Sequence, residues 1–202
     1  MAVGYAGVGR PFVVSDTRGV WTQARVVAPP AGVRFTNGEG AADLYSVTCA
    51  SAGNCVAVGT YTALEGRGPM AISESRGVWG SAYRLALPAN ATNGRNTPDP
   101  TPALLISVAC TSRADCVAVG TYNDADVDRS IDSEPMAATE TSGAWQRALQ
   151  VRLPNGVNPA PPTQTSWLTS IACTSPTDCV AVGFYIDTHR NFQGMVVSTN
   201  RG

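Results

Sequence analysis

The stretch SVACTSRADCVAVGTY, residues 107–122, decides the fold because the chain contains three copies of it. The other two are SVTCASAGNCVAVGTY at residues 46–61 and SIACTSPTDCVAVGFY at residues 170–185. A period of this length in a chain of 202 residues indicates an array of repeated supersecondary units. The phrase AVG also occurs near the N-terminus, and the four copies lie about 60 residues apart, at Ala2, Ala57, Ala118 and Ala181.

Further phrases recur in the same phase and divide each copy into four short segments. The phrases VVSDTRGVW, AISESRGVW and AATETSGAW end at Trp21, Trp79 and Trp145, and VVSTNRG ends at Gly202. The segments are rich in Val, Ile, Thr and Tyr and are bounded by Gly, Pro, Asn, Asp or Ser, which indicates strands. No window carries a sustained helical period. Each Gly before a tryptophan suits a tight hairpin between the third and fourth strands.

Four antiparallel strands in each copy are typical of a propeller blade. We therefore expect an all-β protein, a β-propeller of four-stranded antiparallel blades, with about three blades in one chain. The alternative is a β-sandwich, which would not need the same phrase at a fixed period. The expected units are a partial blade with the second to fourth strands, two whole blades, and a partial blade with the first to third strands, at residues 1–43, 44–104, 105–167 and 168–202.

These motifs resemble a known family of blades. A second strand that ends in Gly-aromatic, and a Gly-x-Trp that opens the fourth strand, resemble the kelch and galactose-oxidase-like blade. With the cysteine pair, the repeat is similar to one found in secreted bacterial β-propeller proteins. The resemblance covers most of the chain and implies a fold, not an activity. The copies have a single glycine, at Gly59, Gly120 and Gly183, where kelch strands have two, and the lone His189 cannot supply the two histidines of a galactose oxidase copper site.

The six cysteines come as one pair in each of the three complete phrases. Each pair brackets a five-residue turn, and in a hairpin this spacing brings the two Cα atoms close to disulfide range. An even count at a repeated spacing predicts disulfides and an oxidising compartment. Zinc ligation and free thiols are the alternatives, although zinc sites favour tighter C-x2-C spacing. The predicted disulfides are Cys49–Cys55, Cys110–Cys116 and Cys173–Cys179.

Composition limits the classes of partner that we expect for this protein. Charged residues make up 14% of the chain and the net charge is −1, so there is no basic footprint for nucleic acid. No apolar run approaches membrane-spanning length, so no membrane insertion is expected. The N-terminal residues MAVGYAGVGRPF lack the features of a signal peptide. We still expect an extracellular or periplasmic protein, because the absent signal is compatible with the disulfides if Met1 is not the natural start.

The strand count predicts self-association. The four successive units are expected to have three, four, four and three strands. These make too few blades for a closed ring, and an open arc leaves unpaired sheet edges. We expect a homodimer in which the terminal strands of two chains complete a ring of six to eight blades. The alternative is a fragment whose spare edges matter only in crystal contacts.

The long connections lie on one face of the expected blades, and we expect the ligand there. Residues 123–134 hold a D-x-D-x-D-x-x-x-D string whose oxygens suit calcium, the one cofactor considered. The match to an EF-hand is partial, because Arg129 replaces the glycine and Pro135 the last glutamate, so a solvated acidic loop is the alternative. The candidate ligands are Asp124, Asp126, Asp128 and Asp132.

Other candidates are isolated residues. Trp167 precedes the first strand of the last copy and could stack on a sugar ring, or could pack its own loop; Phe35 and Arg34 are further ligand-binding candidates. His189 beside Asp187 is the candidate general base, although a lone histidine in a loop is usually just exposed. The acids that recur before each tryptophan point to a structural role or to a ring of carboxylates: Asp16, Glu74 and Glu140.

Three classes of function remain. The first is an extracellular module that binds carbohydrate, another surface polymer or a small molecule. The second is a calcium-dependent hydrolase of the lactonase or phosphotriesterase propeller type, in which the metal polarises the substrate. The third is a structural or assembly domain. The sequence has no nucleophile elbow, phosphate loop or H-E-x-x-H motif, so we favour the binding module.

Overall fold

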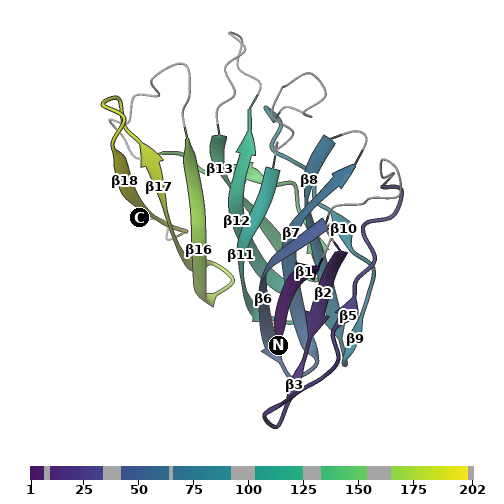
Figure 1. The fold of residues 1–202 in the computed structure, drawn as a ribbon. Coiled ribbons are helices and arrows are strands. Elements are labelled where there is room, and N and C mark those ends of the chain that lie inside the picture. The colour runs from purple at the N-terminus through teal and green to yellow at the C-terminus, as the bar shows by residue number, and fades with distance from the viewer. Residues whose placement is uncertain are drawn as a thin grey trace.

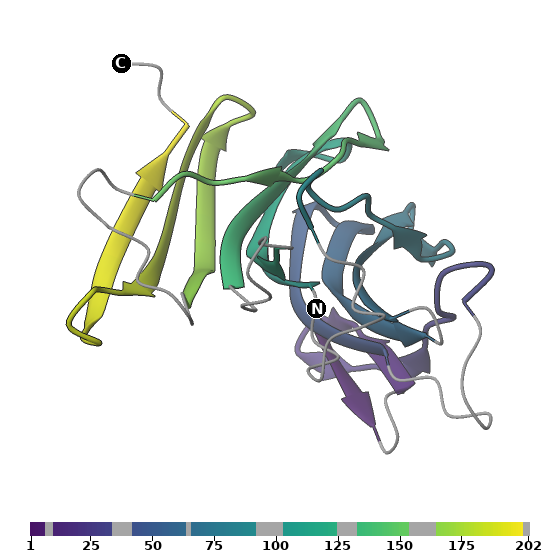
Figure 2. The same cartoon turned by 90° about the horizontal axis from the view of Figure 1, so that it is seen from above.

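The computed structural model describes residues 1–6, 10–33, 42–63, 66–91, 103–124, 133–153 and 165–199. These residues form strands and no helix, so the protein is all-β as predicted. The described strands build four antiparallel sheets of three to five strands, which follow one another along an arc with the N-terminal and C-terminal sheets at its two ends (Figure 1; Figure 2), and β3 and β4 form a separate two-stranded sheet.

Each sheet is formed by one stretch of the chain. The first sheet contains β1 (Ala2–Ala6), β2 (Arg10–Val14) and β5 (Arg25–Val26). The second contains β6 (Ala42–Ser51), β7 (Asn54–Ala63), β8 (Gly66–Ser75) and β10 (Tyr83–Arg84). The third contains β11 (Ala103–Ser112), β12 (Asp115–Asn123), β13 (Ser133–Thr141) and β15 (Leu149–Gln150). The fourth contains β16 (Ser166–Ser175), β17 (Asp178–Ile186) and β18 (Phe192–Ser198).

The fourth strand of each copy is less regular than the sequence predicts. A continuous strand after each tryptophan was expected, but only two-residue pieces pair with the third strand. The chain leaves the ladder between them, and in the third copy the Ala148 N–H donates to the Ala86 carbonyl of the second copy (2.8 Å). A contact with the neighbouring copy therefore replaces part of the ladder. Three of the pieces contain the tryptophans. They are β4 (Val20–Trp21), paired with β3 (Asp16–Thr17); β9 (Val78–Trp79), paired with β8; and β14 (Ala144–Trp145), paired with β13.

The hairpin turns explain the glycine before each tryptophan. Arg76 and Gly77 both have positive φ, 52° and 82°, and Ser142 and Gly143 repeat this with 53° and 81°. Two successive residues with positive φ form the two-residue turn whose twist matches the flanking strands. Only the second position is always glycine, so the first holds a side chain in the left-handed region at some cost.

The glycine of the AVG phrase lies opposite a bulge. The pairing of β6 with β7 shifts between Leu44 and Ser46, and Gly59 sits at this shift. A Cβ atom on Gly59 would overlap the Asp43 carbonyl oxygen, and the equivalent glycines Gly120 and Gly183 show the same overlap. The recurrence of AVG therefore follows from backbone packing inside each sheet.

The disulfides lie at the turn between the first two strands. Their Cα atoms are 3.9 to 4.0 Å apart, and each pair occupies directly opposed positions of the ladder. All six cysteines are paired, as Cys49–Cys55, Cys110–Cys116 and Cys173–Cys179. The predicted cross-links are thus present in the structure, and they fit an oxidising environment.

Apolar residues between neighbouring sheets form the cores. Val58 and Ala71 of the second sheet pack with Leu105 and Met136 of the third in one buried cluster. Because each inner sheet is covered on both sides, its strands are apolar on both faces, which is why they read as continuous runs such as CVAVG.

Hydrogen bonds join each sheet to the next. The Thr60 hydroxyl lies 3.0 Å from the Gly68 carbonyl of its own sheet and 3.1 Å from the Ala103 carbonyl of the next. The Thr121 hydroxyl repeats this, donating to Glu134 and to Ser166 of the fourth sheet at 3.1 and 3.3 Å. These repeated links show that the second, third and fourth sheets are packed in the same way.

Candidate functional site

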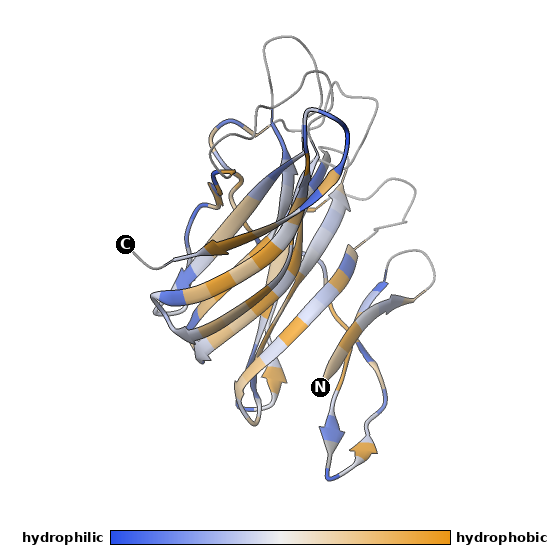
Figure 3. Ribbon diagram, turned by 90° about the vertical axis from the view of Figure 1, so that its left-hand side faces the viewer, coloured by the Kyte–Doolittle hydropathy of each residue, from blue (hydrophilic) through white to orange (hydrophobic). Residues whose placement is uncertain are grey.

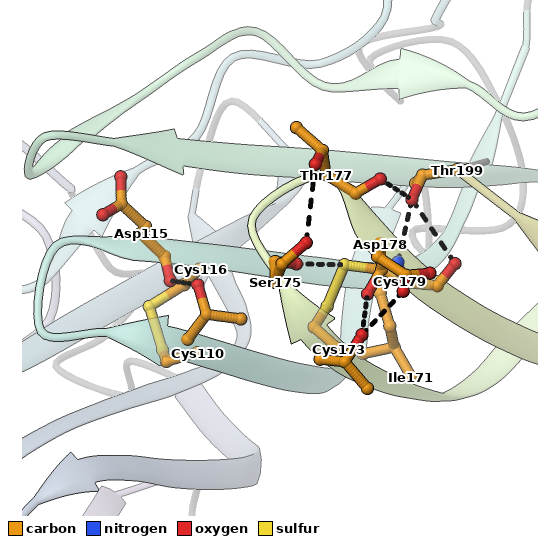
Figure 4. Close-up of a disulfide and its surroundings, with 12 residues drawn as sticks. Cys110, Asp115, Cys116, Ile171, Cys173, Ser175, Thr177, Asp178, Cys179 and Thr199 are labelled. Atoms are coloured by element: carbon orange, nitrogen blue, oxygen red, sulfur yellow. Dashed lines mark hydrogen bonds between the residues drawn. A yellow bond between two sulfur atoms is a disulfide. The ribbon is translucent and has the colours of Figure 1, made fainter. Parts of the chain in front are cut away.

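A pocket of about 300 Å³ opens between the third and fourth sheets, at the end of the strands that carries the disulfides. The third sheet contributes the ends of β11, β12 and β13, and the fourth contributes Cys173 and the turn at Pro176 and Thr177. Figure 4 shows this region, with the two disulfides side by side and Asp115 and Thr177 near them. The lining residues that carry a hydroxyl or a carboxylate are Thr111, Asp115, Thr139, Glu140, Thr141 and Thr177.

Hydroxyl groups dominate the polar part of this pocket. The Thr111 hydroxyl is 3.5 Å from the Asp115 carbonyl, and the Thr177 hydroxyl is 3.4 Å from that of Ser175. Thr139 and Thr141 are exposed, and within the described part of the chain their hydroxyls have no hydrogen-bond partner. A hydroxyl both donates and accepts, so these groups can bind a neutral polar ligand.

Asp115 is fixed in place by the turns around it. Its carboxylate accepts hydrogen bonds from the Ser112 hydroxyl at 2.6 Å and from the Ser142 N–H at 3.1 Å. These bonds lower the pKa of Asp115, with the Ser112 bond as the larger cause. The carboxylate therefore stays ionised at neutral pH and joins the first turn of the sheet to its hairpin.

Glu140 presents the opposite case. It is 4% exposed, and its Oε2 atom is buried with no hydrogen-bond partner. Burial, and to a lesser extent the charge of Asp115, raises its pKa. Glu74 repeats this arrangement in the second sheet, and each of the two acids pairs across its hairpin with a tryptophan. Asp16 in the first sheet is exposed, so the recurring acids differ in environment and do not form a ring of equivalent carboxylates.

The outer face of the fourth sheet is a second feature, and it contains Trp167. The Trp167 ring stacks on Phe184 with 6.1 Å between centroids, and Phe184 contacts Phe192 at 5.4 Å. The Trp167 Nε1 atom is buried with no hydrogen-bond partner. The ring that the sequence offered as a sugar platform thus belongs to an aromatic cluster.

The candidate general base His189 and its neighbour Asp187 belong to neither the pocket nor the aromatic cluster. Asp187 accepts hydrogen bonds at 2.9 Å from the N–H groups of His189 and Asn191 and from Gln193 Nε2, and these bonds lower its pKa, with the Asn191 bond as the largest cause. The His189 ring lies 3.4 Å from the Thr188 hydroxyl. Asp187 therefore holds its own turn, through the backbone of His189 and not through its ring.

Most of the candidate calcium ligands lie outside the described residues. Asp124 is described and forms an isolated bridge with Ala91, whereas Asp126, Asp128 and Asp132 lie outside the described residues. Arg34 and Phe35 also lie outside them. Within the described ranges, no three His, Cys, Asp or Glu residues come together in a way that could hold a metal.

Sequence reasoning missed the pocket, because it assigned binding to the face with the long loops. A usable signal was the set of threonines in AATET and in the turn of the last copy, Thr139, Thr141 and Thr177. Their convergence depends on the packing of two sheets, which the spacing does not reveal.

No helix long and apolar enough to cross a membrane occurs in the part of the chain that the structure describes. No protein-family model matches the chain, and no curated protein shows significant similarity to it.

Proposed function

We propose that this protein is an extracellular or periplasmic β-propeller module that binds a neutral carbohydrate in the pocket between the third and fourth sheets. The propeller assignment is supported by the same strand order in successive sheets and by the same hydroxyl link from one sheet to the next. The compartment is supported by the three disulfides.

The lining of the pocket is the observation that carries the binding function. Threonine hydroxyls that have no partner among the described residues and an ionised carboxylate line a space of about 300 Å³, at the lower end of the size range of small-molecule sites. The hydroxyls of a sugar can donate to Asp115 and exchange hydrogen bonds with Thr139 and Thr141. No lysine, arginine or histidine is among the described residues that line the pocket, which favours a neutral ligand over an anionic one.

The lining also favours binding over hydrolysis. Its cysteines are in disulfides, so they offer no thiol, and its described residues include no histidine to act as a base. Asp115 is engaged by two donors, and Glu140 is buried with a raised pKa. Glycoside hydrolysis requires two carboxyl groups that both reach the sugar, and Glu140, at 4% exposure, is too deeply buried to do so.

Calorimetric titration with maltose, cellobiose, lactose and chitobiose tests the proposal. We expect at least one of these disaccharides to bind with a dissociation constant in the micromolar to millimolar range. Thr141→Trp should fill the pocket and abolish binding. Ser75→Trp is the matched control, because Ser75 occupies the same position in the second sheet, away from the pocket. Absence of binding by the unmodified protein, or equal affinity in the Thr141→Trp variant, would refute a sugar site here.

A further inference from the structure

The two ends of the arc expose apolar sheet faces. On the fourth sheet, Val180 and Val182 are 43% and 42% exposed, and Val196 and Phe192 are 70% and 71% exposed. The alternate residues Cys179, Ala181 and Met195 point to the other face and are buried. Figure 3 views the molecule from the side of this sheet, and its orange segments mark the apolar residues of the strand that leads to the C-terminus. We call this face the C-face; its residues are Trp167, Val180, Val182, Phe184, Phe192 and Val196.

The inner sheets show what normally covers such a face. Val56 and Val58 stand where Val180 and Val182 stand, and they are 2% and 0% exposed, because the third sheet packs on them. In the third sheet, Val119 is 1% exposed and lies in a cluster with Leu168 of the fourth sheet. The same kind of face is thus buried twice within the chain by a following sheet.

The first sheet exposes the face opposite to the one that the fourth sheet exposes. In the inner sheets, the preceding sheet packs on this face. Trp21 is 56% exposed and Val26 is 61% exposed. The equivalent Trp79 is 7% exposed, because the first sheet covers it. Phe12 and Val14 are half-buried, whereas the equivalent Met70 and Ile72 are fully buried. We call this face the N-face; its residues are Phe12, Val14, Trp21 and Val26.

We infer that the C-face of one chain docks on the N-face of a second copy of the same chain, and that two copies form a closed homodimer. Each copy then supplies one C-face and one N-face, so two identical junctions leave no apolar face open. Four sheets from each chain give eight, which lies within the usual range of propeller blades. Burial of apolar surface supplies the driving force.

Three sequence differences between the second and the fourth sheet support a second copy of the chain as the partner of the C-face. The second sheet has Asp43, Thr60 and Arg67 where the fourth has Trp167, Phe184 and Phe192. An ion pair between Asp43 and Arg67, 3.5 Å long, is thereby replaced by stacked aromatic rings. Polar groups that serve a junction inside the chain have become apolar groups on an exposed face.

The change at Phe184 identifies the docking sheet more closely. Its counterpart Thr60 donates to the first strand of the following sheet, and a phenylalanine ring can neither make this bond nor leave room for that strand. The first sheet of this chain consists of β1, β2 and β5, which correspond to the second, third and fourth strands. Within the described residues it presents no first strand at this place, and the aromatic cluster can fill the space. None of the residues named for the two faces is charged, so docking desolvates no charge among them; the exposed Asp16, which pairs with Trp21 across its hairpin, lies beside the N-face.

Multi-angle light scattering after size exclusion tests the inference at micromolar protein concentration. We expect a mass of about 42 kDa, twice the 21.0 kDa of one chain. Val196→Asp and Trp21→Glu place a charge on the C-face and on the N-face respectively, and each should give a monomer. Both residues are exposed, so the variants should retain the circular dichroism of the unmodified protein. Val78→Asp is the matched control, because Val78 is 64% exposed at a hairpin turn and should leave the dimer intact.

A mixing experiment distinguishes this arrangement from contact between two C-faces. A dimer of Val196→Asp with Trp21→Glu contains one undamaged junction, whereas neither variant alone can form any. The mixture should therefore recover dimer. A monomeric unmodified protein would overturn the inference. A Trp21→Glu variant that remains fully dimeric would also overturn it, because the N-face would then not be the surface that covers the C-face. Larger open assemblies would also overturn it, because they show that two copies do not close.

Discussion

At the scale of the residue, small side chains decide whether the sheets can form. Gly59, Gly120 and Gly183 have no positive φ, so their role is not backbone freedom. Each lies where a neighbouring carbonyl oxygen at the bulge occupies the place of a Cβ atom. This requirement is local to one pair of strands, which is why the same glycine recurs in every copy.

Gly120→Ala should therefore destabilise the protein by about 2 kcal/mol, a typical cost of overpacking. The Cβ atom would overlap the Leu104 carbonyl oxygen, and the backbone of β11 would have to move. Urea unfolding under non-reducing conditions measures the change. Gly80→Ala is the control, because its Cβ atom would meet only the Ser73 carbonyl at 3.6 Å. Equal stability of the two variants would contradict the overlap.

Glu140→Gln should stabilise the protein at neutral pH by about 1 kcal/mol, because a buried carboxylate oxygen without a partner is costly. Burial raises the pKa of Glu140 in the folded state. The folded state therefore binds a proton more tightly than the unfolded chain, and stability is lost as the pH rises through the raised pKa. Below the ordinary carboxyl pKa both states are protonated, and the gain from the substitution should disappear.

Unfolding free energies measured at a series of pH values test this expectation. Asp16→Asn is the control, because Asp16 has the same place in the first sheet but is exposed, and we expect little change at any pH. A gain from Glu140→Gln that does not depend on pH would show that the charge of Glu140 is not its cause.

At the scale of the element, the second, third and fourth sheets each contain one hairpin that is closed covalently. The first two strands are ten and nine to ten residues long, and a disulfide joins them next to their turn. The third strand adds to this hairpin, and the fourth pairs only in two-residue pieces. The hairpin therefore combines a long ladder with a covalent cross-link in each of these sheets, and in the third sheet the segment of the fourth strand that leaves the ladder bonds to the neighbouring copy.

Removal of one disulfide by Cys110→Ala with Cys116→Ala should lower the free energy of unfolding by about 2 kcal/mol, because the loop of the cross-link is short. The ladder of the hairpin remains, so the far-ultraviolet circular dichroism should keep its β signature. Urea unfolding of this variant and of the unmodified protein gives the comparison. An unchanged unfolding midpoint would contradict the stabilising role, and a lost β signature would show that the hairpin needs its disulfide to form.

At the scale of the whole molecule, stability and assembly are linked. The end sheets are covered on one side only, whereas the second and third sheets are covered on both. If two copies close as inferred, the end faces become buried in the dimer. The folded form is then favoured by mass action as the protein concentration rises.

The thermal midpoint of the unmodified protein should therefore increase with protein concentration, and that of Val196→Asp should not. The dependence should persist at high salt, because the residues named for the two end faces are apolar and ionic screening acts on charges. Differential scanning calorimetry over a hundredfold concentration range would measure both effects. A midpoint independent of concentration, or one that falls as salt is added, would argue against an apolar junction.

Much of the secondary structure follows from the sequence by itself. The repeats predicted an all-β chain, the order of the strands in each sheet, the tight hairpins and the three cysteine pairs. These features are set by residues close together in the sequence: Gly77 for its turn, Gly59 for its bulge, and two cysteines six positions apart. Local requirements leave a local pattern, and a repeat makes that pattern easy to recognise.

Only the tertiary structure decided which faces are covered and where the polar groups converge. The run CVAVG in β17 has the same composition as its counterparts in β7 and β12, yet Val182 is exposed and Val58 is buried. The difference lies in whether another sheet packs on it, which no strand encodes in its own residues. The stacking of Trp167 on Phe184 and the pocket between the third and fourth sheets depend in the same way on segments distant in the sequence. Burial is a property of neighbours, so the pattern within one strand cannot reveal it.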